Sequence, residues 1–158
     1  MQDTTRQAAL AAPELLLAPE WTLLPEGPAP GQGVAVRGGV FADIGPLAEV
    51  AARHAHLQVV ALPQRLLMPG FVDAHHHLTQ SFGKALAFGE PSEIFRRIWV
   101  PLEGSLDPHA LYLSAKLAAL EALRGGYTTV CDAGARNAAG LQAIEQAAAE
   151  PASAACWA

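Results

Sequence analysis

The sequence predicts an α/β fold in which a β-rich part, residues 1–66, precedes strand and helix units over residues 67–150. Three observations support this prediction. Short runs of leucine, valine and other strand-forming residues, separated by turn formers, fill the first part. An apolar strand that ends in three consecutive histidines opens the second part. A helix, a strand and a further helix follow it, and this alternation is typical of a parallel sheet covered by helices.

The first part begins with residues 1–12, which are polar and alanine-rich and are expected to be a disordered lead-in. The leucines at 15–17 and the run 21–24 predict short strands interrupted by Pro19. Residues 25–33, with the sequence PEGPAPGQG, are dense in turn formers and predict a loop.

A hairpin, a short helix and a strand complete the first part. Residues 33–37 and 40–44 predict two strands, and the glycine pair 38–39 between them is a hairpin signal. Residues 46–56 have helical composition and predict a short surface helix. Residues 58–62 predict the last strand of this part.

The run MPGFVDAHHHL at residues 68–78 is the stretch on which the interpretation of the whole sequence depends. A Pro-Gly turn precedes a strand that starts at residues 71–72 and is expected to be buried. Side chains alternate along a strand, so His75 and His77 are expected to point to one side and His76 to the other. Two imidazoles one strand repeat apart are able to bind one divalent ion, at about 2.0–2.1 Å per nitrogen for zinc. The alternative is a polar loop, or one buried histidine with two solvated neighbours.

The chain after the histidines is expected to be polar and irregular over residues 80–93. Residues 94–100 predict a short amphipathic segment that Pro101 stops. A loop of this length after a strand is where α/β folds place substrate contacts.

The clearest helix signal starts at Asp107, which is a good N-cap, and Pro108 suits the first helical position. The glycine pair 125–126 supplies the stop. One apolar stripe of this helix, with the spacing i, i+4, i+7, is expected to face the core and comprises Leu113, Leu117 and Leu120.

A second strand and a second helix follow. Residues 127–131 are rich in β-branched residues and predict a strand of the parallel sheet, ending at Asp132. Asp132 itself is expected to be a strand-end polar residue and not a catalytic group. A further helix is expected from Asn137 to Glu150. The inward-facing residues of this helix are expected to be Leu141 and Ile144.

The residues Pro-Gly-Phe-Val-Asp-Ala-His-x-His at positions 69–77 resemble the first metal-binding motif of the amidohydrolase superfamily. The following Leu-Thr-Gln-Ser-Phe, residues 78–82, is similar to the branch of cytosine deaminases, chlorohydrolases and adenosylhomocysteine deaminases. The likeness runs from about Gly33 to Ala149. It implies the N-terminal part of a (β/α)8 TIM barrel that carries the first half of a small β-sandwich domain, residues 1–66.

The resemblance also implies an activity: hydrolysis of C–N or C–Cl bonds by a metal-activated water, with deamination of a nitrogen heterocycle as the expected reaction. It implies that His75 and His77 bind one divalent metal ion, zinc, with iron as the alternative. Gln80 lies where similar deaminases place a substrate contact, and the alternative is a solvated loop glutamine. The alternative activities are an amide-ring or imidazolone-type hydrolase of the same superfamily, or a catalytically silent truncated product.

The chain is expected to be an N-terminal fragment with an incomplete barrel. A closed eight-stranded barrel needs about 250 residues, so the catalytic acid and base are expected beyond residue 158 and this chain alone is expected to be inactive. The tail, residues 151–158, fits the expected third strand badly. Back-translated with a final G in the Glu150 codon and read one base earlier, it gives triplets compatible with a barrel strand, so we hypothesise that the tail is out of frame. Resequencing the gene across codon 150 tests this hypothesis.

Composition excludes several classes of partner. The net charge is −5 and no Lys and Arg cluster occurs, so neither nucleic acid nor membrane is expected as a partner. The 51% apolar and 16% charged content fits a globular protein. No signal peptide pattern opens the chain, and its two cysteines predict no disulfide framework. A cytoplasmic protein with a small-molecule substrate is expected, with homo-oligomers as an option for the intact protein.

Overall fold

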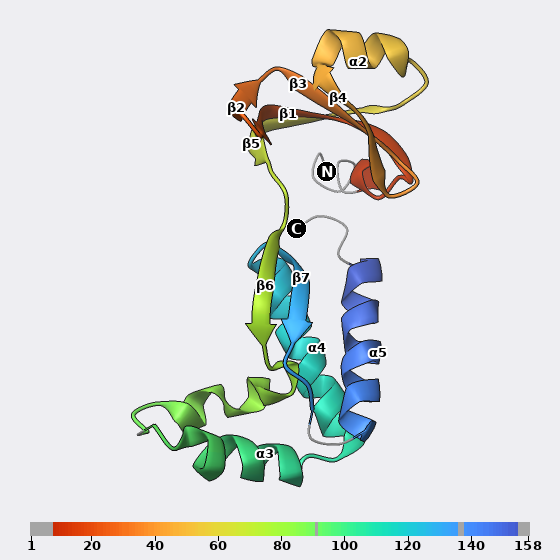
Figure 1. Cartoon of the computed structure of the whole chain (residues 1–158). Helices are drawn as coiled ribbons and strands as arrows, with labels where there is room; N and C mark the ends of the chain where they lie inside the picture. Colours follow the sequence, from red (N-terminus) through yellow and green to blue (C-terminus); the bar gives the residue numbers. More distant parts are fainter. Residues whose placement is uncertain (1–7, 91, 136–137, 155–158) are drawn as a thin grey trace. The chain divides into compact units, whose positions relative to one another are not determined.

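The computed structural model describes residues 8–90, 92–135 and 138–154. Two compact units divide the chain, the first ending at Pro69 and the second starting at Gly70. Figure 1 shows that strands dominate the first unit and that helical segments accompany the strands of the second. Each unit is described by itself.

The first unit contains a five-stranded sheet and the short helix Leu47–Arg53. Strand β1 pairs antiparallel with β3 through its first residues and with β2 through its last residues, and β4 pairs with β3. Strand β5 lies parallel to β1. The elements are β1 (Glu14–Leu24), β2 (Gly27–Pro30), β3 (Gln32–Arg37), β4 (Val40–Pro46), α2 (Leu47–Arg53) and β5 (Val59–Leu67).

Strand β1 is longer than the sequence predicts. Pro19 was expected to separate two strands, but one strand continues through it. The register against β5 shifts between Pro19 and Trp21, and Gln64 on the facing strand has a φ of 60°. This bulge accommodates the proline without ending the strand.

The loop expected over residues 25–33 contains a strand, β2, so this expectation was partly wrong. Residues 27–30 pair with β1 at the edge of the sheet. An edge strand has a partner on one side only, so Pro28 and Pro30 are tolerated although neither has an N–H to donate. The hairpin between β3 and β4, helix α2 and strand β5 confirm the other expectations, and the glycine pair 38–39 has φ values of 58° and 79°.

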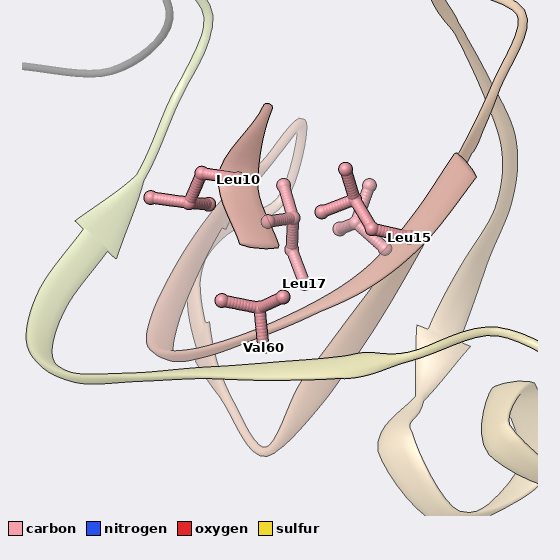
Figure 2. Packing of buried hydrophobic residues seen from close by; sticks show 5 residues of the cluster. Leu10, Leu15, Leu17 and Val60 are labelled. Carbon is pink, nitrogen blue, oxygen red and sulfur yellow. The ribbon is translucent and has the colours of Figure 1, made fainter. Parts of the chain in front are cut away.

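Both faces of β1 are buried, which explains three consecutive leucines. Leu16 packs on the face covered by α2, together with Val50 and Leu57. Leu15 and Leu17 point to the other face, as Figure 2 shows. The cluster on that face comprises Leu10, Leu15, Leu17, Val34 and Val60.

The expectation that residues 1–12 are a disordered lead-in is wrong for residues 8–10. These residues form a helical turn, and Leu10 is 9% exposed. Residues 1–7 lie outside the described residues.

The second unit contains a two-stranded parallel sheet of β6 and β7. Figure 1 shows both arrows running in the same direction, with α4 and α5 alongside and the segment from η1 to α3 beyond the strand ends. The elements are β6 (Phe71–His76), the 3₁₀ segment η1 (Leu78–Ala87), the π-helical turn η2 (Phe95–Trp99), α3 (Val100–Ser105), α4 (Pro108–Arg124), β7 (Tyr127–Asp132) and α5 (Ala138–Ala154).

The described residues form no closed barrel: the parallel sheet has two strands. Phe71 and Val72 were expected to be buried but are 49% and 64% exposed. Their exposure follows from the narrow sheet, since a strand of a parallel sheet is buried only where other elements cover both of its faces.

Helix α4 begins and ends where the sequence predicts. Asp107 accepts a hydrogen bond from the Ala110 N–H at 2.8 Å, and Gly126 follows the helix with a φ of 85°. The predicted inward stripe is wrong, because Leu113, Leu117 and Leu120 are each about two-fifths exposed. Small residues face the neighbouring η1 and α5 instead and permit their close approach, and the buried set is Leu111, Ser114, Ala115, Ala118 and Ala119.

Helix α5 continues beyond Glu150, and the expected cap Asn137 lies outside the described residues. Ile144 packs against the core as expected, whereas Leu141 is 54% exposed. Ala143 and Ala147 are buried instead.

The stretch after the histidines is more ordered than expected. Residues 78–87 form η1, and its first residues are buried. Pro101 does not stop the preceding segment, because η2 leads directly into α3. Pro101 lies in the first turn of α3, where no intrahelical partner for its N–H is needed.

A polar cluster joins α4 to α5. Lys116 Nζ lies 2.7 Å from Glu150 Oε2, and the Tyr112 hydroxyl donates to the same oxygen at 2.6 Å. The hydrogen bonds from Lys116 and Tyr112 lower the pKa of Glu150 to about 2. Glu150 also raises the pKa of Lys116. The cluster is therefore ionic throughout the neutral range.

We expect Leu16→Ala to lower the free energy of unfolding by about 2–5 kcal/mol, because the side chain is fully buried and leaves a cavity. Urea unfolding followed by circular dichroism measures this loss. Leu66→Ala is the matched control, since Leu66 is 47% exposed on β5, and its loss is expected to be less than half as large. Equal losses would contradict the assignment of Leu16 to the core.

The Glu150 cluster predicts a pH dependence. The folded-state pKa is lowered from 4.5 to about 2, so the stabilisation is fully present above about pH 4.5 and is lost as the pH falls through about 2. The midpoint of urea unfolding of Glu150→Gln should lie below that of the unmodified chain at pH 6, and the difference should shrink as the pH falls and vanish below about pH 2. Glu145→Gln, an exposed position of the same helix, should show no such convergence.

Candidate functional site

His75 and His77 meet at the carboxyl end of β6. Their ring centroids are 5.1 Å apart and the ring planes are inclined by 81°. The His76 ring contacts Asp73 instead, with its Nδ1 2.8 Å from Asp73 Oδ2. The alternation expected along the strand therefore brings two imidazoles together. Metal binding by this pair stays a prediction.

The two imidazoles fit a divalent metal ion as part of its ligand set. The Nδ1 of His77 is buried and makes no hydrogen bond to the residues that the structure describes. A buried nitrogen without a partner is costly, and a metal ion would satisfy it. Catalytic zinc sites use three protein ligands. Within the described ranges, however, no group of three or more His, Cys, Asp or Glu side chains is placed to hold a metal.

Backbone hydrogen bonds fix the segment that carries the histidines. The His75 N–H donates to Asp73 Oδ1 at 3.2 Å, and the Ala133 N–H donates to the His76 carbonyl oxygen at 2.8 Å. Asp132 accepts from the N–H groups of Leu78 and Gly134, both at 2.7 Å. Asp132 is thus a strand-end polar residue, as expected, and it lies directly beside the histidine segment.

The hydrogen bonds from the His76 ring and the His75 N–H lower the pKa of Asp73. The Asp73 carboxylate is therefore ionised at neutral pH and accepts both bonds.

Gln80 is buried, which excludes the solvated loop glutamine. The side chain is 8% exposed, and its Nε2 donates to Glu103 Oε1 at 2.8 Å. The Thr79 hydroxyl donates to the same oxygen at 3.3 Å. A substrate contact of Gln80 is not tested by this geometry and stays a prediction.

Glu103 is a buried carboxylate that sequence reasoning missed. It is 4% exposed and lies in α3, 23 residues after Gln80. The available signal was its setting, a single acidic residue directly after the apolar run of residues 98–102. A buried carboxylate needs hydrogen-bond donors in place of water, and Thr79 and Gln80 supply them here, so Glu103 is a candidate partner of Gln80.

An open hollow lies on the segment between η1 and α3, and it includes none of the histidines. Arg97 and Glu90, which both line this hollow, form an ion pair with 3.0 Å between Arg97 Nη1 and Glu90 Oε2. Its lining residues are Leu86, Glu90, Arg97, Ile98, Pro101, Leu102 and Ser105. No helix in the described part of the chain is long and apolar enough to span a membrane.

Strand β6 starts at a close contact with β7. A Cβ at Gly70 would lie 2.2 Å from Thr128 Oγ1 and 2.3 Å from Thr128 Cγ2. Only glycine therefore fits where the strand that carries the histidines begins.

The comparisons with known proteins agree with the motif. Residues 66–157 match the sequence model of the Amidohydrolase family. The 5-methylthioadenosine/S-adenosylhomocysteine deaminase of Syntrophobacter fumaroxidans is 31% identical over 69% of this chain and 27% of the relative. The 5′-deoxyadenosine deaminase of Methanobrevibacter smithii is 34% identical over 48% of this chain and 18% of the relative. The chain thus spans about a quarter or less of the length of these curated relatives.

Solved structures show the same fold. The E. coli guanine deaminase aligns with a TM-score of 0.71 at 19% identity, over 87% of this chain and 34% of the enzyme. An adenosine deaminase from Xanthomonas campestris with bound zinc aligns with a TM-score of 0.65 at 23% identity, over 84% of this chain and 31% of the enzyme.

We expect Gly70→Ala to separate the start of β6 from β7, because the new methyl group would overlap Thr128. Amide hydrogen exchange is the measurement, and protection of β6 and β7 should fall. Gly104→Ala is the matched control, since no atom lies within 4 Å of its Cβ position. Unchanged protection in Gly70→Ala would show that the contact is not this close in solution.

Proposed function

The chain belongs to the amidohydrolase family, and on this premise we propose that the whole protein is a metal-dependent hydrolase that deaminates a nitrogen heterocycle. The observation that carries the proposal is the convergence of His75 and His77 at the end of β6, inside the stretch that matches the family. The names of these two curated relatives, both deaminases, favour an amino leaving group over chloride or an amide ring. The substrate proposed is an adenosine-like small molecule.

We propose that β6, α4, β7 and α5 are the first part of a (β/α)8 barrel. In such barrels the carboxyl ends of the strands carry the active site, and both histidines lie at such an end. The likeness to deaminase structures supports this assignment. Further metal ligands and the groups that move protons would come from later strands of the whole barrel.

His75 and His77 would hold the metal ion, and zinc is favoured because the similar adenosine deaminase contains it. A bound zinc ion lowers the pKa of a water molecule to about 7 and so supplies a nucleophile near neutral pH. The net reaction adds water to the ring carbon and releases ammonia, which leaves a carbonyl group in place of the amine. Asp73 engages the His76 ring, so that this imidazole has a partner of its own.

Gln80 would position the substrate. Its Nε2 donates to the Glu103 carboxylate, and a carboxylate only accepts, so the orientation of the amide is fixed. The Gln80 Oε1 is then left to accept a hydrogen bond from an N–H or O–H group of the substrate. Glu103 acts through Gln80 in this arrangement.

Ammonia release and zinc content test the proposal on two proteins, the 158-residue chain and the longest protein that its gene encodes. The longer protein is expected to hold about one zinc ion and to deaminate 5′-methylthioadenosine or a related aminated heterocycle. The short chain should retain zinc weakly, because two ligands do not close a stable site. Turnover by the short chain alone would mean that a second subunit supplies the missing ligands.

Substitution of the ligands gives the sharper test. His75→Ala and His77→Ala in the longer protein are each expected to lower activity more than about 100-fold, since loss of groups that merely support a ligand costs about 10–100-fold. His56→Ala, an exposed histidine of the first unit, is the control and should change neither zinc content nor rate. Full activity in His77→Ala would contradict the proposed function.

A further inference from the structure

The histidine segment leaves the sheet between its two candidate ligands. Strand β6 ends at His76, so His75 lies within the strand and His77 lies beyond it. The register against β7 pairs Asp73 and His76 but passes over His75, where it shifts, and it ends before His77. Something other than the sheet must therefore fix the backbone at His77 if the two rings are to keep one arrangement.

Two carboxylates accept from backbone N–H groups before and after His77 along the chain. Asp73 accepts from the His75 N–H and faces the His76 ring. Asp132, at the end of β7, accepts from the Leu78 N–H directly after His77. The other oxygen of Asp132 accepts from the Gly134 N–H, so this carboxylate is itself held in place.

We propose that Asp73 and Asp132 are positioning residues that set the distance and orientation of the His75 and His77 rings for metal binding. The proposal rests on the proposed function, since it concerns the same two ligands. A purely structural role, in which the two aspartates only cap strand ends, is the alternative. It predicts a loss of stability without a separate loss of metal affinity.

The chemistry of Asp132 makes a sharp substitution available. An aspartate presents two acceptor oxygens and meets two N–H donors here. Asparagine has the same shape but one acceptor and one NH₂ donor, so one of the two N–H groups would face another donor. Asp132→Asn therefore removes one of the two bonds with little change in volume.

The test measures three quantities on the 158-residue chain: zinc affinity by competition with a chromophoric chelator, amide hydrogen exchange, and the urea midpoint. Asp132→Asn is expected to weaken zinc binding about tenfold and to speed exchange of the Leu78 amide at least as much. Asp73→Asn, the second variant, is expected to weaken zinc binding as well. If Asp132→Asn does not fold, the zinc affinity of Asp73→Asn tests the positioning role.

Asp43→Asn is the matched control. Asp43 is also a carboxylate with two partners, Arg53 and His54, but it lies in the first unit. Its substitution should shift the urea midpoint without changing zinc affinity. If Asp132→Asn and Asp73→Asn match this control in both quantities, the positioning role is wrong.

Failure of the proposed function is recognised separately. The metal assignment fails if the longer protein binds no zinc or if His75→Ala leaves its zinc binding unchanged, and absence of zinc from the short chain alone does not decide it. The positioning role is then read from the nuclear Overhauser contact between the His75 and His77 rings. Loss of that contact in Asp132→Asn supports the role, and its retention overturns it.

Discussion

The parallel pairing of β6 with β7 is the constraint on which the second unit depends. Parallel strands place their carboxyl ends at the same edge of a sheet, and here His76 is the register partner of Asp132. The histidine segment and the turn after β7 are therefore brought together by strand direction alone. Gly70 makes this pairing possible at its beginning, where Thr128 leaves no room for a side chain.

Small residues and polar contacts organise the rest of the second unit around these strands. Alanines on α4 let η1 and α5 approach closely, and the Ser114 hydroxyl donates to the Thr79 carbonyl oxygen at 2.9 Å. This bond holds the start of η1 against α4, so Gln80 is buried beside Glu103. The position of a candidate substrate contact thus follows from helix packing and not from loop sequence.

The sequence was a good guide where the signals are local and a poor one where burial depends on distant partners. The N-cap Asp107 and the glycine pair 38–39 act on their own neighbours, and both were predicted. The stripe of α4 was wrong because η1 and α5 select the buried face, and periodicity does not identify partners. Gln80 could not be placed for the same reason, since its partner Glu103 lies 23 residues away.

The contact between Asp132 and Leu78 has a consequence for how the protein is made. The two residues are separated by 54 positions in the chain. At a synthesis rate of about 5–20 residues per second, the histidines leave the ribosome roughly 3–11 s before the carboxylate that anchors the segment. During that interval the imidazoles belong to a flexible nascent chain. Their final arrangement is therefore reached only after β7 has been synthesised and has paired.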